Sequence, residues 1–512
     1  MPELSAVGID LGTTYSSLAI VDSNGKPEIV PNAEGERLTP SAVLFDDDGI
    51  VVGQIARDAA VRCPDRVVMF IKHQMGNRAW HYTYRNQEHS PTDVSAMILA
   101  KLKRDAEQHL GRPLQQAVIT VPAYFDDDRR RATRAAGEIA GFQVLGLLNE
   151  PTAAAIAFGV ERSQREETVL VYDLGGGTFD VTIMHVAREE IRVIATDGDH
   201  QLGGKDFDDA LIGFVVERFA AERGFGPMRD PYTTEDLRMR AEKAKRELSL
   251  RPKTQVLLRA GDQASTVEVR REQFEALIKV KLDTTLTIVR SALQAAQLAP
   301  AQIDRVLLIG GSTRIPAVRA LLRQFFGRDP DVSVNPDEAV ALGAGLMAAR
   351  KALEIAPEEV AAPVAEKIGG LQITDVTSHS VGIEAVVPGT QQRVNSILIP
   401  RNSPIPVEVA KEFLTTDPGQ RAIKVTIYQG ESPVPDLCNP IGEFVLAGLP
   451  PGRPAGCKVR VTVACTTDGV ISVTALDIET GKQTTTQVSY RVGPSAEQVS
   501  AKQRWLRANP VV

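Results

Sequence analysis

Aspartate followed by a glycine-rich turn occurs twice in this 512-residue sequence, each time between two apolar segments. Residues 7–14 read Val-Gly-Ile-Asp-Leu-Gly-Thr-Thr, and residues 169–178 read Val-Leu-Val-Tyr-Asp-Leu-Gly-Gly-Gly-Thr. Each segment predicts a buried strand, a tight turn and a second strand. Glycine allows unusual dihedrals and close approach of a ligand, so such turns can direct several backbone N–H groups at one anion. The residues of these turns that could donate to phosphate are Gly12, Thr13, Thr14, Gly175, Gly176, Gly177 and Thr178.

Three aspartates, Asp10, Asp173 and Asp180, would stand at strand ends beside these turns. Carboxylates repel a polyphosphate unless a divalent cation lies between them, and Mg²⁺, which often keeps several waters, meets that need. Because a strand rather than a helix follows each turn, neither a P-loop nor a dinucleotide fingerprint fits. One such stretch alone would be an ordinary hairpin, but two in one chain favour a magnesium–phosphate site.

The elements around these motifs indicate a duplicated α/β domain. Residues 118–122 and 306–310 form a second corresponding pair of apolar strand candidates, each followed by a helical stretch. Two such halves predict two lobes with a cleft between them. The second strand of this pair leads into Gly310-Gly311-Ser312-Thr313-Arg314, a glycine turn before a helix that could also face a nucleotide. Helical periodicity is strongest over residues 95–110, 127–140, 235–248, 271–298 and 315–326.

The sequence changes character after about residue 350. Residues 356–363, Ala-Pro-Glu-Glu-Val-Ala-Ala-Pro, are typical of an exit from a helix into a linker. From residue 370 to 492, apolar runs are short, rich in β-branched residues and alternate with a period of two. This pattern predicts a β-sandwich. The expected division is the two-lobed α/β phosphate-binding domain over 1–355, a linker over 356–375, the sandwich over 376–492 and a short tail over 493–512.

Composition limits the possible functions. The formal charge of −7 argues against broad nucleic-acid affinity. The four cysteines, Cys63, Cys438, Cys457 and Cys465, lack close metal-ligand spacing, and small buried side chains are the simplest interpretation, although Cys457 and Cys465 could pair. No apolar stretch reaches the length of a membrane span, and the first residues lack the pattern of a signal peptide. We therefore expect a cytoplasmic protein without nucleic-acid or membrane partners.

Taken together, several motifs closely resemble those of the heat-shock-70 (DnaK-type) chaperone family. The resemblance runs from about residue 6 to residue 492 and implies an α/β actin-like ATPase domain, a linker and an all-β sandwich that binds unfolded or extended polypeptide. It also implies ATP and ADP as ligands, Mg²⁺ and potassium as ions, and J-domain cochaperones and nucleotide exchange factors as partners. The motifs that carry it are residues 8–16, 119–125, 149–155, 173–180 and 310–316.

The resemblance also implies roles for individual residues of the ATPase domain. Lys72 matches the γ-phosphate lysine, whose charge would offset the charge that develops during phosphoryl transfer. Glu150 and Asp173 match the carboxylates that organise magnesium and the attacking water, with Thr178 beside them, while Asp10 and Asp180 match ion-site partners. Pro122 and Arg130 match the switch between the lobes. Further nucleotide-binding positions implied are Tyr15, Gly203, Gly204, Glu242, Lys245, Arg246, Ser249, Gly310, Gly311, Ser312, Arg314 and Asp337.

In the predicted sandwich, the resemblance implies a peptide channel that holds an extended segment by backbone hydrogen bonds and an aliphatic pocket. Without the resemblance, these apolar side chains would be assigned to the sandwich core. Val386 and Thr416 match the pair that arches over the peptide. The channel positions are Ile383, Phe413, Ile423, Val425 and Val470.

The sequence departs from the family pattern in five places. The stretch between Lys72 and Pro122 is short, which would alter the contact with an exchange factor. Gly146 stands where the family has an arginine for J-protein docking, although Asn149 and Thr152 match neighbouring contact positions. In the linker, Gln372 and Thr374 should weaken apolar docking onto the ATPase domain, although Asp375 is kept. His379, beside the peptide pocket, is expected to be a solvated loop histidine. Residues 493–512 are too few for the family's helical lid, and 495–505 could start one helix.

Two other functions fit parts of the pattern. A sugar or acetate kinase of the actin-like superfamily would share the hairpins, but the sandwich and the Lys72 and Glu150 motifs argue against it. An exchange factor resembling the larger heat-shock proteins would bind ATP with negligible turnover. The complete set of Lys72, Glu150, Asp173 and Thr178 favours turnover instead.

Overall fold

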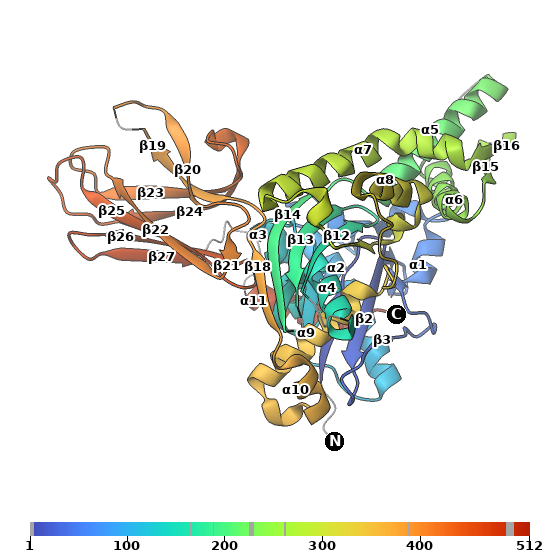
Figure 1. The fold of residues 1–512 in the computed structure, drawn as a ribbon, viewed down its shortest axis with the longest axis horizontal. Coiled ribbons are helices and arrows are strands. Elements are labelled where there is room, and N and C mark those ends of the chain that lie inside the picture. Colours follow the sequence, from blue (N-terminus) through green and yellow to red (C-terminus); the bar gives the residue numbers. More distant parts are fainter. Residues whose placement is uncertain are drawn as a thin grey trace.

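In the computed structural model, residues 5–162, 166–187, 189–224, 230–260, 263–387, 389–487 and 496–512 are described. The expected boundary between residues 492 and 493 lies outside these ranges. Two α/β lobes lie side by side, and an all-β domain projects from them (Figure 1). None of the described helices is long and apolar enough to cross a membrane.

Lobe I is built on a sheet in which β1 forms an antiparallel hairpin with β2 and runs parallel to β10. Its edges are β11 on one side and β3 on the other, with β4 paired to β2. Smaller sheets, β6-β5-β7 and β8-β9, flank it. The strands are β1 (Ala6–Asp10), β2 (Tyr15–Val21), β3 (Pro27–Val30), β4 (Thr39–Pro40), β5 (Ala42–Phe45), β6 (Ile50–Val52), β7 (Val67–Met69), β8 (Tyr82–Tyr84), β9 (Gln87–His89), β10 (Gln116–Val121) and β11 (Gln143–Asn149).

Lobe II repeats this arrangement, which confirms the predicted duplication. β12 and β13 form the hairpin, and β17 runs parallel to β12 as β10 does to β1. β14 follows β13 in the sheet, and β18 lies beyond it. The strands are β12 (Glu167–Leu174), β13 (Phe179–Val186), β14 (Glu190–Asp199), β15 (Lys253–Ala260), β16 (Gln263–Arg270), β17 (Arg305–Ile309), β18 (Gln372–Val376) and β21 (Pro404–Ile405).

The helices of the two lobes match the predicted periodicity closely. Ser90 caps α2 in a capping box with Asp93, and Gly111, at φ 67°, ends that helix in the left-handed region that glycine tolerates. Asp126 caps α3 by accepting from the Arg129 N–H. The helices are α1 (Gln54–Ala59), α2 (Pro91–Leu110), α3 (Asp127–Ile139), α4 (Glu150–Arg162), α5 (Gly204–Arg223), α6 (Pro231–Leu250), α7 (Arg271–Ala296), α8 (Pro316–Phe326), α9 (Ala339–Ile355) and α10 (Ala362–Ile368).

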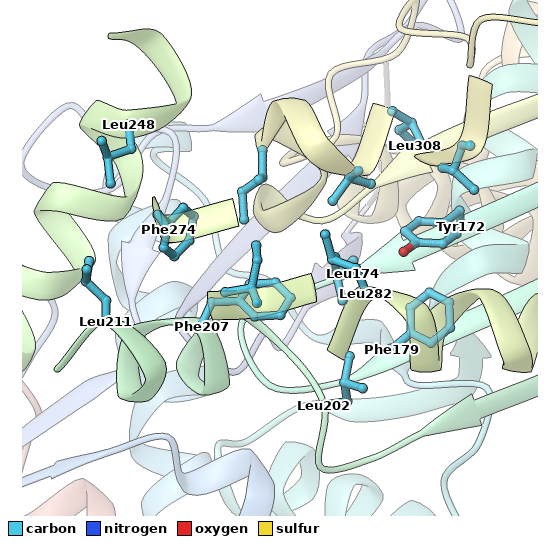
Figure 2. Packing of buried hydrophobic residues seen from close by; sticks show 14 of the residues in the cluster. Tyr172, Leu174, Phe179, Leu202, Phe207, Leu211, Leu248, Phe274, Leu282 and Leu308 are labelled. Atoms are coloured by element: carbon cyan, nitrogen blue, oxygen red, sulfur yellow. The ribbon is translucent and has the colours of Figure 1, made fainter. Parts of the chain in front are cut away.

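Each lobe has its own core, and two helices join the lobes. In lobe II, Tyr172 and Phe179 of the hairpin pack against Phe207 of α5 and Leu282 of α7, all fully or almost fully buried (Figure 2). Full burial of such a side chain contributes about 1.5–3 kcal/mol, so the hairpin is held firmly. A separate cluster packs α4 and α9 against strands of both sheets. The two lobes are therefore joined through α4 and α9.

The C-terminal part forms a sandwich of two four-stranded antiparallel sheets, as predicted, and we call it the β-domain. One sheet has the order β20-β19-β23-β24 and the other β22-β25-β26-β27. Alternate residues of each strand face a shared core that includes Ile427, Val463 and Val473. The strands are β19 (Val381–Val386), β20 (Arg393–Ile399), β22 (Val407–Leu414), β23 (Ala422–Gln429), β24 (Asn439–Ala447), β25 (Lys458–Cys465), β26 (Ile471–Asp477) and β27 (Gln483–Gln487).

The connection between the two lobes and the β-domain is folded and docked. After α10, β18 pairs in parallel with β14 of lobe II, through residues 372–374, and antiparallel with β21. The expectation that Gln372 and Thr374 weaken apolar docking stays a prediction, because the pairing shows a contact between β18 and β14 and not its strength. Strand pairing uses backbone N–H and C=O groups, so it does not require apolar side chains.

The last helix, α11 (Ala496–Ala508), agrees with the helix predicted near residues 495–505 and packs on lobe I rather than on the β-domain. Leu506 and Val511 join the lobe I core, and Trp505 packs against His89 with ring centroids 4.8 Å apart. Lys502 contacts both Asp93 carboxylate oxygens at 2.6 Å. Residue 512 exchanges backbone hydrogen bonds with residues 50 and 52 of β6.

Candidate functional site

The two glycine-rich turns face each other across the cleft between the lobes. The first lies between β1 and β2, where the Ser41 hydroxyl donates to the Gly12 carbonyl at 2.8 Å. The second lies between β12 and β13, where the Gly175 N–H donates to the Thr178 carbonyl at 3.0 Å. A β-carbon on Gly176 would lie 2.1 Å from the Thr14 hydroxyl oxygen. The turns therefore approach each other closely enough to enclose one phosphate chain, and only glycine fits there.

The start of α5 supports the second turn from behind. The backbone N–H groups of Gly204 and Lys205 donate to the carbonyls of Gly175 and Gly176 at 2.9 and 2.8 Å. A β-carbon on Gly203 would lie 2.4 Å from the Gly177 nitrogen. Gly203 and Gly204 thus permit close packing that fixes the turn, and neither they nor Gly177 line the cleft itself.

Lys72 and Glu150 form a buried ion pair at the bottom of the cleft, with Nζ and Oε1 2.5 Å apart. Lys72 lies on a short 3-10 helix, η2 (Ile71–Gln74), and Glu150 begins α4. Burial opposes the lysine charge, but Glu150 and Asp10 outweigh it and raise the pKa of Lys72. The cleft therefore holds a fixed positive charge between the two phosphate turns.

The three predicted metal-site aspartates lie around this ion pair in a strongly unfavourable electrostatic environment. Burial, followed by repulsion from Glu150, raises the pKa of Asp10 and of Asp180 to about 7 and the pKa of Asp173 well above its ordinary value. Asp10 accepts from the Thr120 hydroxyl at 3.3 Å, and Asp180 accepts from the Tyr124 N–H at 3.1 Å. A bound cation would relieve this repulsion. Within the described ranges, no three carboxylate, histidine or cysteine side chains converge on one point.

On the lobe II side, residues of α6 form a clamp at the mouth of the cleft. Glu242 pairs with Arg246 at 2.6 Å, and Arg246 donates to the Tyr15 hydroxyl at 2.8 Å. Lys245 donates to the Gly204 carbonyl at 2.8 Å, and Ser249 lies one turn further along the same face. The predicted clamp residues are thus brought together with the first phosphate turn from the other lobe.

The third glycine motif closes the same cleft. Gly310 has φ 82°, and a β-carbon there would lie 2.4 Å from the Leu174 carbonyl oxygen. Ser312 donates to the Gly175 carbonyl at 2.8 Å, and Arg314 pairs with Asp337 at 2.5 Å. The cleft has a volume of about 1560 Å³. The predicted residues that line it are Asp10, Gly12, Thr13, Thr14, Tyr15, Lys72, Glu150, Asp173, Gly175, Gly176, Thr178, Glu242, Lys245, Arg246, Ser249, Gly310, Gly311, Ser312, Arg314 and Asp337.

Three side chains at the site were not singled out from the sequence. Arg57 of α1 donates to the Tyr15 hydroxyl and pairs with Glu242 at 2.5 Å, which ties the small sheet of lobe I to α6. Asp208 of α5 pairs with Lys245 at 2.8 Å. The His73 ring packs against Gly177. No local motif marks these residues, because each reaches the site only through tertiary packing.

The predicted switch residues lie between the cleft and the β-domain. Pro122 follows β10, and its carbonyl accepts from the Phe125 N–H at 3.1 Å. Arg130 of α3 is buried and donates to the Phe125 and Ala123 carbonyls at 3.0 and 3.1 Å and to Asn149 at 2.7 Å. On its other side, Gly469 of the β-domain packs against the guanidinium.

Asp375 of β18 anchors the connection beside this switch. Its carboxylate accepts from Asn149 at 2.9 Å and from Thr152 at 3.0 Å, which are the two residues predicted for partner contact. A β-carbon on Gly146 would lie 3.2 Å from an Asp468 carboxylate oxygen of the β-domain, and Asp468 pairs with Arg134 at 2.6 Å. The surface around Gly146, where the family has an arginine, is therefore in contact with the β-domain.

His379 is an interface side chain, so the expectation of a solvated loop histidine was wrong. Its Nε2 lies 3.2 Å from the Tyr124 carbonyl oxygen, and its ring packs edge-on against the Tyr124 ring. Burial lowers the pKa of His379. Ser378 beside it donates to the Ala123 carbonyl.

The predicted peptide positions are only partly grouped. Ile383 and Val425 are buried in the sandwich core, and Phe413 and Ile423 pack on it while partly exposed. Val386 is 40% exposed at the end of β19, and Thr416 is exposed in the loop after β22. Val470 does not belong to that core cluster as formed by the described residues. It lies in the turn before β26, between Gly469 and Ile471.

Two lobes with paired phosphate turns, a buried lysine–carboxylate pair and a clamp of α6 residues define an actin-like ATP-binding domain, here joined to a β-sandwich. The chain belongs to the Hsp70 family, whose sequence model, described as "Hsp70 protein", matches residues 6–504. It is therefore an ATP-binding molecular chaperone with ATPase activity that acts on client polypeptides.

Its similar proteins include three named "Chaperone protein DnaK". The one from Thermotoga maritima is 42% identical over 503 residues, covering 96% of this chain and 82% of the relative. The one from Thermosipho melanesiensis is 41% identical over 501 residues, with the same coverage. The one from Thermosipho africanus is 42% identical over 492 residues, covering 95% and 80%. These matches set aside the sugar or acetate kinase alternative and favour a chaperone over an exchange factor.

Proposed function

We propose that residues 1–355 bind and hydrolyse magnesium-ATP, and that residues 356–375 transmit the nucleotide state to a peptide-binding domain over residues 376–492. In this scheme residues 493–512 form a tail attached to the ATPase domain. The single observation that carries the catalytic part is the Lys72–Glu150 ion pair at 2.5 Å, buried between phosphate turns from opposite lobes.

In the proposed complex, backbone N–H groups and hydroxyls of the two turns hold the β- and γ-phosphates. Residues of α6 and the Gly310–Arg314 turn hold the nucleoside, with Asp337 fixing Arg314. Lys72 offsets the charge that develops on the transferring phosphoryl group, while Glu150 orients the Lys72 side chain and the attacking water. Thr178 donates from the second turn.

The aspartates fit a magnesium ion held mainly by water and phosphate. Asp10 and Asp173 line the cleft and Asp180 lies close to Glu150; burial, followed by repulsion from Glu150, raises the pKa of all three. Mg²⁺ commonly uses one or two carboxylates together with water and substrate phosphates, so it needs no closed cage of protein ligands. When bound, the ion would neutralise charge on the phosphates. Potassium remains a prediction from the family resemblance.

We further propose that unfolded or extended polypeptide binds the β-domain at Ile383, Phe413, Ile423 and Val425, with Val386 and Thr416 above it. The resemblance places Val470 in the same channel, although it lies in the turn before β26. A J-domain cochaperone would meet altered contacts, because Gly146 offers no side chain and Asn149 and Thr152 already bond Asp375. The exchange factor and the cytoplasmic location stay predictions from the sequence.

Substitution of Lys72 tests the catalytic proposal. Lys72→Ala should reduce single-turnover hydrolysis by roughly 100- to 1000-fold, as loss of one preorganised charge typically does. ATP affinity should stay near the wild-type value, because the turns and the clamp are intact. Lys103→Ala serves as the matched control, since Lys103 is a lobe I lysine that donates to the Gly141 carbonyl away from the cleft. Wild-type hydrolysis by Lys72→Ala would remove Lys72 from the mechanism.

A further inference from the structure

A second cavity lies behind the second phosphate turn, on the side away from the nucleotide cleft. It has a volume of about 780 Å³, and residues of lobe I, lobe II and the β-domain line it. Lys72 lines the nucleotide cleft, whereas its neighbour His73 lines this rear cavity. The two cavities are thus separated by only a thin layer of protein.

That layer consists of glycines and one imidazole. Gly177 stands at its centre, and a β-carbon there would lie 1.6 Å from His73 Nε2. Gly203 packs against the other side of Gly177. His73 Nε2 is buried and has no hydrogen-bond partner within the ranges that the structure describes. The His73 ring therefore fills space against the turn and is not held in place by a hydrogen bond from its Nε2.

The order in which phosphate and ADP leave the cleft gives this layer a role in the proposed reaction. In the orientation proposed above, ADP fills the cleft from its clamped nucleoside to its β-phosphate. The cleaved phosphate is left deepest, beside Lys72 and Thr178. It cannot leave through the mouth of the cleft before ADP does. Behind this position, Gly177 and His73 separate it from the rear cavity.

The charges in the rear cavity suit a phosphate that passes through rather than one that stays. Asp126, Asp128 and Asp206 line it, together with the cations Arg129 and Lys205. Arg129 is paired with Asp126, and Lys205 with Asp209 at 2.6 Å. An anion would find hydrogen-bond donors here but an unfavourable net charge, so it would not be retained.

We propose that the rear cavity is the exit route for inorganic phosphate and that the His73 side chain separates it from the nucleotide cleft. The proposal rests on the proposed function, since it takes the nucleotide orientation from it. Movement of one imidazole ring off Gly177 would join the two cavities while ADP stays bound.

The test separates hydrolysis from phosphate release in one single-turnover experiment. Acid quenching measures conversion of ATP to ADP, and a fluorescent phosphate-binding reporter measures free phosphate in the same preparation. His73→Ala should shorten the delay between hydrolysis and phosphate release severalfold, whereas His73→Trp should lengthen it. His185→Ala is the matched control, because His185 lies on β13 and contacts Thr168 away from both cavities.

A second variant tests the phosphate exit route without altering the side chain that packs on the second phosphate turn. Gln201 lines the rear cavity with an exposed side chain, and its backbone N–H donates to the Asp199 carboxylate at 2.8 Å. Gln201→Trp should narrow the route and slow phosphate release severalfold, with normal hydrolysis and ADP release. Wild-type release from Gln201→Trp and from both His73 variants, with hydrolysis intact, would overturn the exit route and leave the proposed function standing. Absence of hydrolysis in the wild-type protein would instead overturn the proposed function.

Discussion

Asp208 illustrates how burial sets the charge state of a side chain on which the nucleotide clamp depends. Its carboxylate pairs with Lys245 at 2.8 Å, yet burial dominates and raises the pKa of Asp208 to about 6. One carboxylate oxygen is buried without a hydrogen-bond partner in the described structure. Asp208 thus positions Lys245 at a cost in stability that grows as the carboxyl ionises.

This cost predicts a pH dependence. A carboxyl group whose pKa is raised on folding favours the folded state at low pH, and the advantage is lost as pH rises through the folded pKa. Between pH 4.5 and 7.5, Asp208→Asn should therefore gain stability relative to wild type by about 2 kcal/mol, because part of the shift from 3.8 to about 6 is already expressed below pH 4.5. Urea unfolding of both proteins across this range measures the difference. A constant difference would show that Asp208 titrates normally.

At the residue scale, the sequence identified the groups that lie in local motifs. Asp10, Asp173 and the glycines stand in hairpins, so their convergence followed from the duplication. Lys72 lies in an ordinary-looking segment and was assigned only through the family resemblance. Arg57 had no signal at all, because a lone arginine on a short helix becomes part of the site only when α1 and α6 meet.

Among the elements, α11 has the least expected position. The helix itself was predicted from residues 495–505, but its binding surface on lobe I comes from residues about 400 positions earlier in the chain. Local periodicity contains no information on such a partner. β18 was also missed as a strand, because its pairing with β14 depends on backbone geometry and not on an apolar pattern.

The packing of α11 predicts a stability effect in the ATPase domain. Leu506 is 8% exposed and belongs to the lobe I core. Leu506→Ala should lower the free energy of unfolding of that lobe by about 2 kcal/mol, near the lower end for buried leucines. Thermal unfolding with bound ADP measures it, and Leu437→Ala, at a leucine 76% exposed in the β-domain, is the control. Equal effects of the two substitutions would mean that α11 is not docked in solution.

For the whole molecule, the order of the domains could be predicted from the change in hydrophobic pattern along the sequence. The docking of the β-domain onto the two lobes could not. The interface is assembled from single side chains of separate elements: Arg130, Arg134, Asp375, His379 and Asp468. None of them forms a motif. Sequence reasoning therefore placed Arg130 as a switch only by resemblance, while the structure shows it buried between Asn149 and the β-domain.

Coupling between the domains should depend on Arg130. Arg130→Ala removes the donor of three hydrogen bonds, to the Phe125 and Ala123 carbonyls and to Asn149. The cleft residues stay in place, so basal hydrolysis should persist while its stimulation by peptide falls. Both rates are measured on one preparation. Arg218→Ala on α5, where the arginine stacks on Phe214, provides the control. Equal stimulation of Arg130→Ala and wild type would reduce Pro122 and Arg130 to structural roles.

Peptide exchange should be fast even with ADP bound. α11 packs on lobe I, so it does not cover the β-domain in this arrangement, and differences in affinity usually reside in the dissociation rate. The measurement is dissociation of a fluorescent leucine-rich peptide from the ADP-bound protein. Release over many minutes would show that another element covers the groove.

The position of that groove is tested separately. Ile423→Asp places a charge among apolar side chains and should abolish peptide binding. Lys424→Ala, at the next residue and therefore on the opposite face of β23, is the matched control. Unchanged binding by Ile423→Asp would show that the peptide binds elsewhere.

The docked positions of β18 and α11 also have a mechanical consequence. β18 ties the start of the β-domain to lobe II, and α11 ties the chain after it to lobe I. The chain from Gln487 to Ala496 can span only about 30 Å, at 3.3–3.6 Å per residue. The β-domain is therefore tethered to both lobes, one at each end of its chain. Its movement away from the lobes is limited while both attachments persist. Any rotation that opens or closes the cleft changes the distance between the two anchors and pulls directly on the peptide-binding domain.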